Sequence, residues 1–403
     1  MTVWLDRGSL GPSWTVQGDR LVTAAQTAGL QRLDCAFAET VELRPGAVNA
    51  HTHLYSGLAP LGMPPPPRPP KDFVEILKLV WWRLDRALDE RSLRASARYA
   101  IAGALLAGTT SLIDHHESPG LIDGSLDLLG DAAQELGARL VVGYGATERN
   151  GGREEAKRGL RECERFIRSN RRPLVTGLLA LHASFTVSDE TLREAGALAR
   201  SLKVGMHVHV AEDLADVADA KQRGYAGPLE RLLDLEALPA GSIIAHGVHL
   251  DDAQVRRADA AGLWLVQNPR SNEGNKVGYP RALAASTHVA LGTDGWPAEM
   301  NVEREALFRL GRANGESDAD LEERTSGGWG LINWLTKGHT GAVEAGATAD
   351  VVVGIAGQRP RHVLVGGRPV VVDGKLISAD FEEIQARTRE EAPRLWARMQ
   401  ALD

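Results

Sequence analysis

The chain has 403 residues, of which 43% are hydrophobic and 25% charged, and its formal net charge is -7. This composition excludes a disordered or fibrous protein, and an acidic balance without a basic stripe argues against a nucleic-acid partner. No signal-peptide core opens the chain and no run approaches the ~20 apolar residues of a membrane span, so we expect a cytoplasmic protein with no membrane partner. The two cysteines, Cys35 and Cys163, stand in no metal or redox spacing, which fits a reducing compartment.

The predicted elements change character twice along the chain. Residues 1–44 contain short strands separated by turns, and from residue 45 short apolar runs alternate with longer helical segments, a rhythm typical of βα units. The apolar runs predict strands at 46–51, 109–115, 138–145, 174–182, 204–210, 241–246, 263–268 and 288–293. Helices are predicted between them, among others at 90–107, 152–169, 188–202 and 251–261.

Strands and crossovers in this number, over roughly 250 residues, predict an α/β fold of the (β/α)8 TIM-barrel type. The alternative, an open doubly wound sheet, would need a glycine-rich phosphate loop (G-x-G-x-x-G), which the sequence lacks. After about residue 345 strand-like runs return, and Gly366-Gly367 between two of them predicts a hairpin turn. We therefore predict a barrel over 45–344, a small β domain built from 1–44 and 345–378, and a C-terminal helix over 379–403.

Two segments are predicted to be loops near a binding site. Residues 60–70 hold seven prolines and Trp81-Trp82 follows soon after. We interpret this segment as a stiff lid whose tryptophans cover a pocket mouth; a polyproline ligand for another protein is the alternative. The polar segment 268–275 follows the seventh strand, where barrel enzymes place substrate contacts. Trp82 and Asn272 are accordingly candidate substrate-binding residues.

Imidazole and carboxylate side chains follow the ends of four predicted strands: His51 and His53, His207 and His209 with Glu212, His246, and Asp294. Such side chains are suited to zinc or ferrous iron, and a barrel builds a metal site from the ends of several strands. Residues two apart on a strand point the same way, so His51 and His53 can hold one ion. His209 lies nearer the strand end than His207, so we predict His209 as the ligand and His207 as a packed imidazole. Asp294 supplies the fourth, anionic ligand.

The same residues predict hydrolytic chemistry. A divalent metal lowers the pKa of bound water from 15.7 to about 7. Asp294 can hold that water's proton, His246 can polarise the substrate, and Glu212 can carry a proton to a leaving group. The fourth strand, 174–182, contains no lysine, which a two-metal barrel of the carbamylated-lysine kind would need there. We therefore predict one Zn or Fe per chain.

Other residues are more ambiguous in the sequence. His182 ends the fourth strand and is a candidate substrate contact, with a packed core histidine as the alternative. Trp296 could stack on a flat ring, or be an ordinary packed indole. For His115, His116 and His249 a purely structural role is at least as compatible with the pattern.

These motifs resemble the amidohydrolase superfamily, in its branch of mononuclear aminohydrolases (ATZ/TRZ-like) that includes guanine, cytosine, triazine and adenosine-homologue deaminases. The resemblance rests on PGAVNAHTH at 45–53, HVHVAE at 207–212, AHGVHL at 245–250 and LGTDG at 291–295. A closer similarity, to the SsnA-like aminohydrolases, rests on WWRLD at 81–85, IDHHESP at 113–119, LHASFT at 181–186 and NPRSNEGN at 268–275. Asn268 stands where many deaminases of this branch carry a histidine.

The resemblance implies a small domain in the form of a β-sandwich and a homodimer. It also implies a metal held by His51, His53, His209 and Asp294, with Glu212 and His246 beside it. Three functions follow. The first is a metal-dependent aminohydrolase that deaminates a small nitrogen heterocycle, purine- or pteridine-like, and releases ammonia. The second keeps the site but opens a cyclic amide or dechlorinates a triazine. The third is a non-catalytic barrel that binds a ligand or partner, against which the complete ligand set with Glu212 argues.

Overall fold

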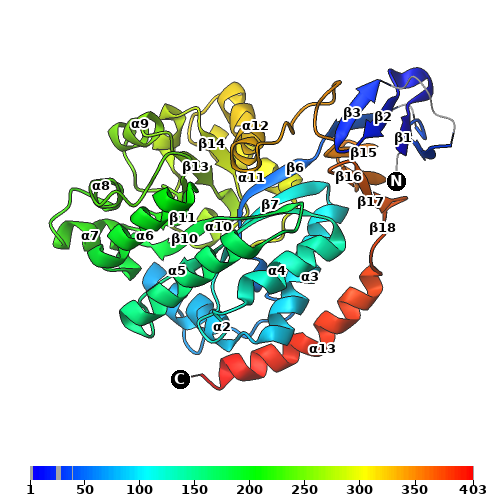
Figure 1. The fold of residues 1–403 in the computed structure, drawn as a ribbon. Coiled ribbons are helices and arrows are strands. Elements are labelled where there is room, and N and C mark those ends of the chain that lie inside the picture. The colour runs from blue at the N-terminus through cyan, green and yellow to red at the C-terminus, as the bar shows by residue number, and fades with distance from the viewer. Residues whose placement is uncertain (1–2, 24–28, 39, 403) are drawn as a thin grey trace.

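The computed structural model describes residues 3–23, 29–38 and 40–402. Its centre is a barrel of parallel strands in which neighbours follow the chain order (Figure 1). The barrel strands are β6 (Ala47–Thr52), β7 (Thr109–His116), β8 (Arg139–Ala146), β9 (Val175–Gly177), β10 (Leu179–Ala183), β11 (Met206–Val210), β12 (Ile243–His246), β13 (Trp264–Gln267) and β14 (Val289–Leu291). A bridge between Thr52 and Asp294, with a 2.9 Å hydrogen bond from Thr293 N to His51 O, joins the last strand to the first. The predicted (β/α)8 barrel is confirmed.

The barrel strands are apolar because both of their faces are covered. Every residue of β7 and β8 is buried, and inward residues from several strands, including Ile113, Val141 and Val266, form one hydrophobic cluster inside the barrel. The fourth strand, predicted as a single run, is divided at Leu178 into β9 and β10. Both parts pair with β8 in the same register, so the break leaves the barrel intact.

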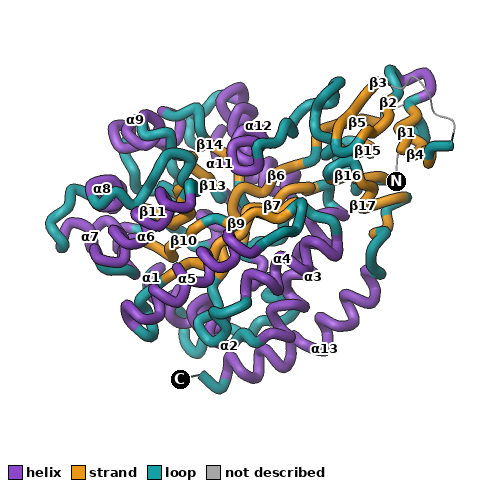
Figure 2. Tube along the Cα trace, viewed as in Figure 1, coloured by secondary structure: helices purple, strands orange, loops and turns teal. Residues whose placement is uncertain are grey.

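Helices surround the strands on the outside (Figure 2). They are α3 (Glu90–Leu106), α4 (Ser125–Leu136), α5 (Gly152–Ser169), α6 (Asp189–Leu202), α7 (Leu214–Gln222), α8 (Pro228–Asp234), α9 (Asp252–Ala260), α11 (Met300–Ala313) and α12 (Asp318–Thr336). Side chains before the first turn fix where several of them begin: Asp89, Ser188 and Asp251 accept hydrogen bonds from backbone N–H groups of α3, α6 and α9. The sequence predicted the first residue of each of these three helices to within two residues of its observed position.

The two ends of the chain form two further sheets beside the barrel. One sheet has the order β3-β2-β1-β4, from β1 (Val3–Asp6), β2 (Trp14–Gln17), β3 (Arg20–Thr23) and β4 (Gln31–Asp34); η1 (Gly8–Leu10) lies between β1 and β2. The other has the order β18-β17-β16-β15-β5, from β5 (Val41–Pro45), β15 (Val351–Ile355), β16 (His362–Val365), β17 (Arg368–Val372) and β18 (Lys375–Leu376). Leu5 and Trp14 of the first sheet share a hydrophobic cluster with Val351 and Leu364 of the second.

The predicted hairpin turn at Gly366-Gly367 joins β16 to β17, and both glycines have positive φ (53° and 75°). An ion pair between Arg139 of β8 and Asp350, with 3.0 Å hydrogen bonds from Arg139 Nε and Nη2, ties the second sheet to the barrel. Residues 1–2, 24–28, 39 and 403, which belong to the predicted segments 1–44 and 379–403, lie outside the described residues.

The segment after β6 forms one wall of the barrel mouth. It contains η2 (Leu54–Ser56), α1 (Phe73–Ile76), the π-helical turn η3 (Leu77–Trp81) and α2 (Trp82–Ala87). The C-terminal helix α13 (Phe381–Gln400) runs along α3 and braces this segment (Figure 1). Trp396 Nε1 donates to Leu61 O at 3.1 Å and Arg398 Nε donates to Ala87 O at 2.8 Å.

The long polar loop predicted at 268–275 is instead mostly a short helix, α10 (Pro269–Gly274). Two short turns, η4 (Ser184–Thr186) and η5 (Arg281–Ala285), complete the elements.

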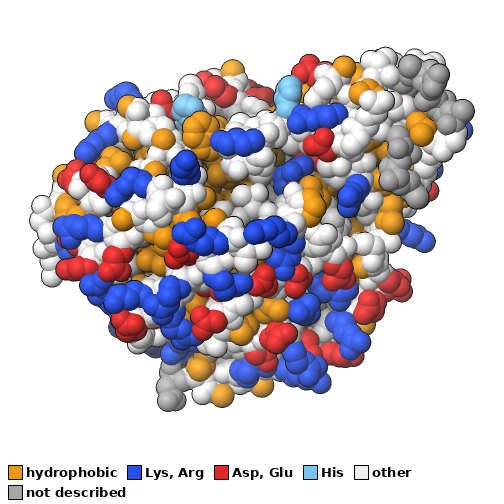
Figure 3. Space-filling view, in the orientation of Figure 1, with side chains coloured by type: hydrophobic (Ala, Val, Ile, Leu, Met, Phe, Trp, Pro, Cys, Tyr) orange, Lys and Arg blue, Asp and Glu red, His pale blue; other side chains and the backbone are white. Residues whose placement is uncertain are grey.

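Positive and negative side chains alternate over the face shown in Figure 3. None of the helices in the described part of the chain is long and apolar enough to cross a membrane.

Candidate metal centre and active site

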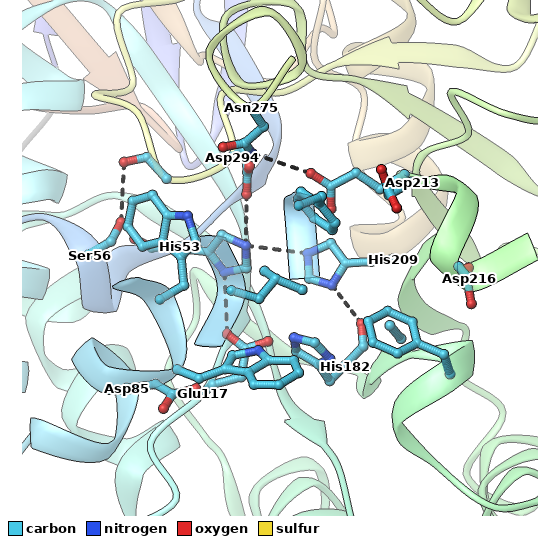
Figure 4. Close-up of a pocket in the computed structure, with 18 of the residues that line it drawn as sticks. His53, Ser56, Asp85, Glu117, His182, His209, Asp213, Asp216, Asn275 and Asp294 are labelled. Carbon is cyan, nitrogen blue, oxygen red and sulfur yellow. Dashed lines mark hydrogen bonds and ion pairs between the residues drawn. The ribbon is translucent and has the colours of Figure 1, made fainter. Parts of the chain in front are cut away.

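Three of the residues predicted from the strand ends, His53, His209 and Asp294, meet at the carboxyl end of the barrel (Figure 4), and His51 and His246 lie beside them. His53 Nε2 lies 2.9 Å from Asp294 Oδ1 and 3.3 Å from His209 Nε2. His51 Nε2 lies 3.4 Å from the same Asp294 oxygen. Ligand atoms of His51, His209, His246 and Asp294 all lie within 4.8 Å of one another. Parallel strands end at one rim of a barrel, which is why residues more than 240 positions apart in sequence converge here.

Backbone carbonyls orient two of these imidazoles. His53 Nδ1 donates to His115 O at 2.5 Å, and His209 Nδ1 donates to His182 O at 2.6 Å. With the proton on Nδ1, each ring presents the lone pair of Nε2 to the centre of the cluster. Hydrogen bonds of this kind to the far ring nitrogen are how proteins fix the tautomer of metal-binding histidines.

The two histidines of β11 have different surroundings. His209 lines the cavity, whereas His207 is fully buried behind the cluster and its Nε2 lies 2.9 Å from His51 Nδ1. His207 Nε2 therefore stands where it can accept a hydrogen bond from His51 Nδ1, which leaves His51 Nε2 free. That geometry supports the prediction that His209, and not His207, faces a metal.

The cluster fits a divalent metal. His51 Nε2 and His246 Nε2 are buried and have no hydrogen-bond partner in the described residues, which is costly unless another species contacts them. Three imidazole nitrogens and one carboxylate oxygen form a donor set suited to zinc or ferrous iron. β9 and β10 carry no lysine, so the bridging ligand of two-metal barrels is missing from the fourth strand.

Glu212 and His246 lie beside the cluster. Glu212 Oε2 is 3.6 Å from His246 Nε2, and Glu212 Oε1 accepts a 3.4 Å hydrogen bond from Asn275 Nδ2. Burial raises the pKa of Glu212 well above its ordinary value, and the nearby charge of Asp294 adds to this shift. Burial also opposes ionisation of Asp294, but the imidazoles of His51 and His53, whose Nε2 atoms lie 3.4 and 2.9 Å from Asp294 Oδ1, outweigh it and hold the pKa of Asp294 well below its usual range. The two carboxyl groups therefore differ in proton affinity, as an acid and a base do.

Backbone strain is concentrated at this rim. Ala211, His246 and Asp294 follow or end β11, β12 and β14 with φ values of 51°, 75° and 53°, in the left-handed region that non-glycine residues rarely adopt. Each such residue costs about 1–3 kcal/mol and is held in place by its surroundings. Strain of this kind clusters at functional sites.

A cavity opens onto the cluster. Its walls are largely aromatic, from Phe73, Trp81, Trp82 and Phe185, and its polar lining includes His53, Glu117, His182, His209, Glu212 and Asp294. Of the predicted substrate contacts, Trp82 and His182 line the cavity. Asn272 lies one layer behind and accepts a hydrogen bond from His246 Nδ1 at 2.8 Å. Trp296 is 47% exposed and lies outside this lining, with the Arg270 guanidinium 5.7 Å from its ring centre.

The polar residues of the site that were not predicted include Glu117, Ser271 and Asn275. Ser271 Oγ donates to Asp294 Oδ2, and Asn275 bonds Glu212. Glu117 directly follows β7 and lines the cavity. The strand-end argument that selected the other residues would also have selected Glu117, had it been applied to the second strand.

The barrel, the small sheets and the histidine–aspartate cluster together define a class of metal-dependent hydrolases. Residues 43–370 match the amidohydrolase family, and the chain belongs to that family. The predicted assignment is thereby confirmed, and with it the prediction of a hydrolytic enzyme.

Named relatives agree with this assignment. The chain is 28% identical over 390 residues to 5'-deoxyadenosine deaminase from Methanopyrus kandleri, covering 88% of this chain and 86% of the relative. It is 28% identical over 396 residues to 8-oxoguanine deaminase from Pseudomonas aeruginosa, covering 88% of this chain and 87% of the relative. A solved structure of an adenosine deaminase from Xanthomonas campestris with bound zinc superposes with a TM-score of 0.81 at 20% identity, covering 99% of both chains. Atrazine chlorohydrolase from Arthrobacter aurescens TC1, complexed with zinc, has the same fold (TM-score 0.77, 20% identity, 95% of both chains).

Proposed function

We propose that this chain is a zinc- or iron-dependent aminohydrolase that deaminates a small nitrogen heterocycle, purine- or pteridine-like. One observation carries the proposal: the Glu212 carboxyl group faces the His246–Asp294 cluster inside a cavity with aromatic walls. A carboxyl group beside a metal cluster supplies acid–base chemistry, and aromatic walls accept a flat ring. The names of the two deaminase relatives, both of which refer to purine derivatives, support the same substrate class.

In this proposal the metal is held by Nε2 of His51, His53 and His209 and by Asp294 Oδ1. A bound divalent ion supplies the Lewis acidity that makes water a nucleophile at neutral pH. The hydrogen bonds from Nδ1 of His53 and His209 keep the two rings turned toward that position.

The protein's own groups then handle protons and orientation. Asp294 accepts one proton of the attacking water and passes it to the departing amino group. Glu212 delivers its proton to a ring nitrogen and regains the second proton of that water, so both carboxyl groups end as they began. His246 Nε2 contacts the reacting carbon's oxygen, while Asn272 fixes the ring of His246 from behind. Trp82 and His182 contact the heterocycle; Trp296, outside the lining, has no role in this arrangement. Water adds to the carbon that bears the amino group, the C–N bond breaks, and ammonia leaves.

A screen for ammonia release across purines, pteridines and pyrimidines, with metal analysis of the same preparation, tests the proposal. We expect ammonia from at least one heterocyclic amine and about one Zn or Fe per chain. Chloride release from a triazine, or opening of a cyclic amide without ammonia, would identify the alternative reactions. Two tightly bound metals per chain, or none after reconstitution, would contradict the single-metal site.

We further propose that the small β-sandwich domain comprises 1–44 and 345–378, beside a barrel over 45–344 and the helical segment 379–403, and that the protein is a cytoplasmic homodimer. The hydrophobic cluster shared by the two small sheets supports the first proposal. Light scattering should give twice the mass of one chain; the mass of a single chain would contradict the dimer.

A further inference from the structure

A second carboxylate, Glu117, lies in the wall of the same cavity and has no role in the chemistry described above. It follows the last residue of β7, is 1% exposed and lines the cavity. Neither Oε1 nor Oε2 has a hydrogen-bond donor among the described residues. A buried carboxylate without donors is costly, because it has lost water and gained nothing in exchange.

The groups around Glu117 are committed elsewhere. His115 Nδ1 is 2.8 Å from Glu117 Oε1 but out of line for a hydrogen bond, while His115 Nε2 bonds Leu181 O at 3.0 Å. His53 Nδ1, 3.6 Å from Glu117 Oε2, already donates to His115 O. The neighbouring cation, Arg149, donates to Asp85 at 2.8 Å instead. Positive charge is therefore near Glu117, but no N–H points at its oxygens.

A second metal ion is one occupant that the surrounding atoms suggest, but they suit it poorly. Glu117 forms two ligand groupings, one with His53 and His115 and the other with His182 and His209. Each grouping borrows a histidine, His53 or His209, whose Nδ1 donates to a carbonyl and whose Nε2 belongs to the Asp294 cluster. Too few free donors remain for a separate tight site. A hydrogen-bond donor on the substrate fits better.

We propose that the Glu117 carboxylate accepts hydrogen bonds from N–H groups on the edge of the substrate ring opposite the reacting carbon. The enzyme would then select heterocycles that carry an amino-substituted amidine on that edge. This inference rests on the proposed function and narrows its substrate class to guanidine-like rings. Two parallel N–H groups match the two oxygens of a carboxylate. The aromatic walls hold the ring plane, and Glu117 sets which edge of the ring faces away from Glu212.

Equilibrium binding of two small probes tests this, in samples where ammonia analysis shows that neither probe turns over. 2-Aminobenzimidazole presents a guanidine-like edge and benzimidazole lacks it; titration of the metal-loaded protein can follow tryptophan fluorescence or heat. We expect the parent to bind 2-aminobenzimidazole at least tenfold more tightly than benzimidazole. Glu117→Gln should weaken only 2-aminobenzimidazole, by about 10–100-fold, the size expected for hydrogen bonds to a charged group. Equal binding of both probes by the parent, or an unchanged preference in the variant, would overturn the proposal.

Glu162→Gln is the matched control, because Glu162 is an equally buried carboxylate on α5, bonded to Arg165 outside the cavity. Glu162→Gln should leave the preference for 2-aminobenzimidazole over benzimidazole unchanged. If this preference fell as much in Glu162→Gln as in Glu117→Gln, the effect would not be specific to Glu117 and the proposal would be wrong. Metal analysis distinguishes a bound substrate edge from a second metal ion at Glu117. Two metals per chain in the parent and one in Glu117→Gln would make Glu117 a metal ligand and overturn the proposal. If no amine is deaminated but the probe preference depends on Glu117, the subsite stands and the proposed reaction fails.

Discussion

Replacing Glu212 by glutamine separates catalysis from metal binding. The amide keeps the shape of the side chain and its contact with Asn275 but cannot carry a proton. Glu212 lies 3.6 Å from His246 Nε2 and is outside the group of His51, His209, His246 and Asp294 whose ligand atoms lie within 4.8 Å of one another. Metal content and fold should therefore persist. The rate should fall by roughly 10²–10⁴, the usual contribution of a positioned acid–base group, or about 3–5 kcal/mol in the barrier.

The assay is ammonia release under steady-state conditions, with kcat and KM measured separately on the amine found by the screen. The loss should appear in kcat, with KM little changed, because the proton transfer belongs to the transition state. Asp213→Asn is the control: it alters the neighbouring carboxylate, whose Oδ1 caps α7 at Ala215 N, and asparagine caps a helix equally well. Glu212→Gln turning over substrate at nearly the parent rate would refute the proton-carrier role. Loss of metal in that variant would make Glu212 a ligand.

Three further variants test the site and the pH dependence of stability. His209→Ala should abolish metal retention. His207→Ala should keep the metal and lower the Tm, because His207 contacts His51 from behind. If metal analysis showed that His207→Ala loses the metal and His209→Ala keeps it, the roles of the two histidines would be exchanged. Burial raises the pKa of Asp216 to about 7. The folded chain then binds more protons than the unfolded chain between about pH 4 and pH 7, so stability falls as pH rises through that window. Asp216→Asn should gain several degrees in Tm relative to the parent from about pH 5 to pH 8; parallel curves would contradict this.

The sequence predicted the barrel well because its signal is redundant. Each strand is a short apolar run, and several of the helices that follow have a start signal, such as Ser188 before α6 or Asp251 before α9. The choice between His207 and His209 needed only the two-residue period of a strand and the rule that barrel sites lie at strand ends. Their observed places, behind and inside the cavity, agree with that choice, although metal binding by His209 stays a prediction.

Glu117 directly follows β7, so its place at a strand end is visible in the sequence, but its burial is not. A carboxylate is seldom buried without a partner, and the cavity that Glu117 lines together with Trp82 is formed by segments far apart in the chain. For Trp296 a substrate contact stays a prediction. An aromatic residue two positions after Asp294 looked like a stacking surface, but the chain turns there and leaves the ring half exposed beside Arg270. Periodicity gives the direction of a side chain on a strand; it does not give its direction after the strand ends.

The helix α10 shows most clearly what local propensity leaves out. Its sequence, PRSNEG, places serine, asparagine and glycine, which are weak helix formers, after a proline suited to the first position, so the sequence predicted a loop. Tertiary contacts stabilise the helix, including the Arg270–Glu303 ion pair. The helical turn then sends Ser271, Asn272 and its C-cap residue Asn275 to three different groups: Asp294, His246 and Glu212, respectively. Each proposed catalytic side chain thus has one partner at this single short helix. A loop could place such partners one at a time, whereas a helix fixes their spacing, which explains why this polar segment is ordered against its own propensity.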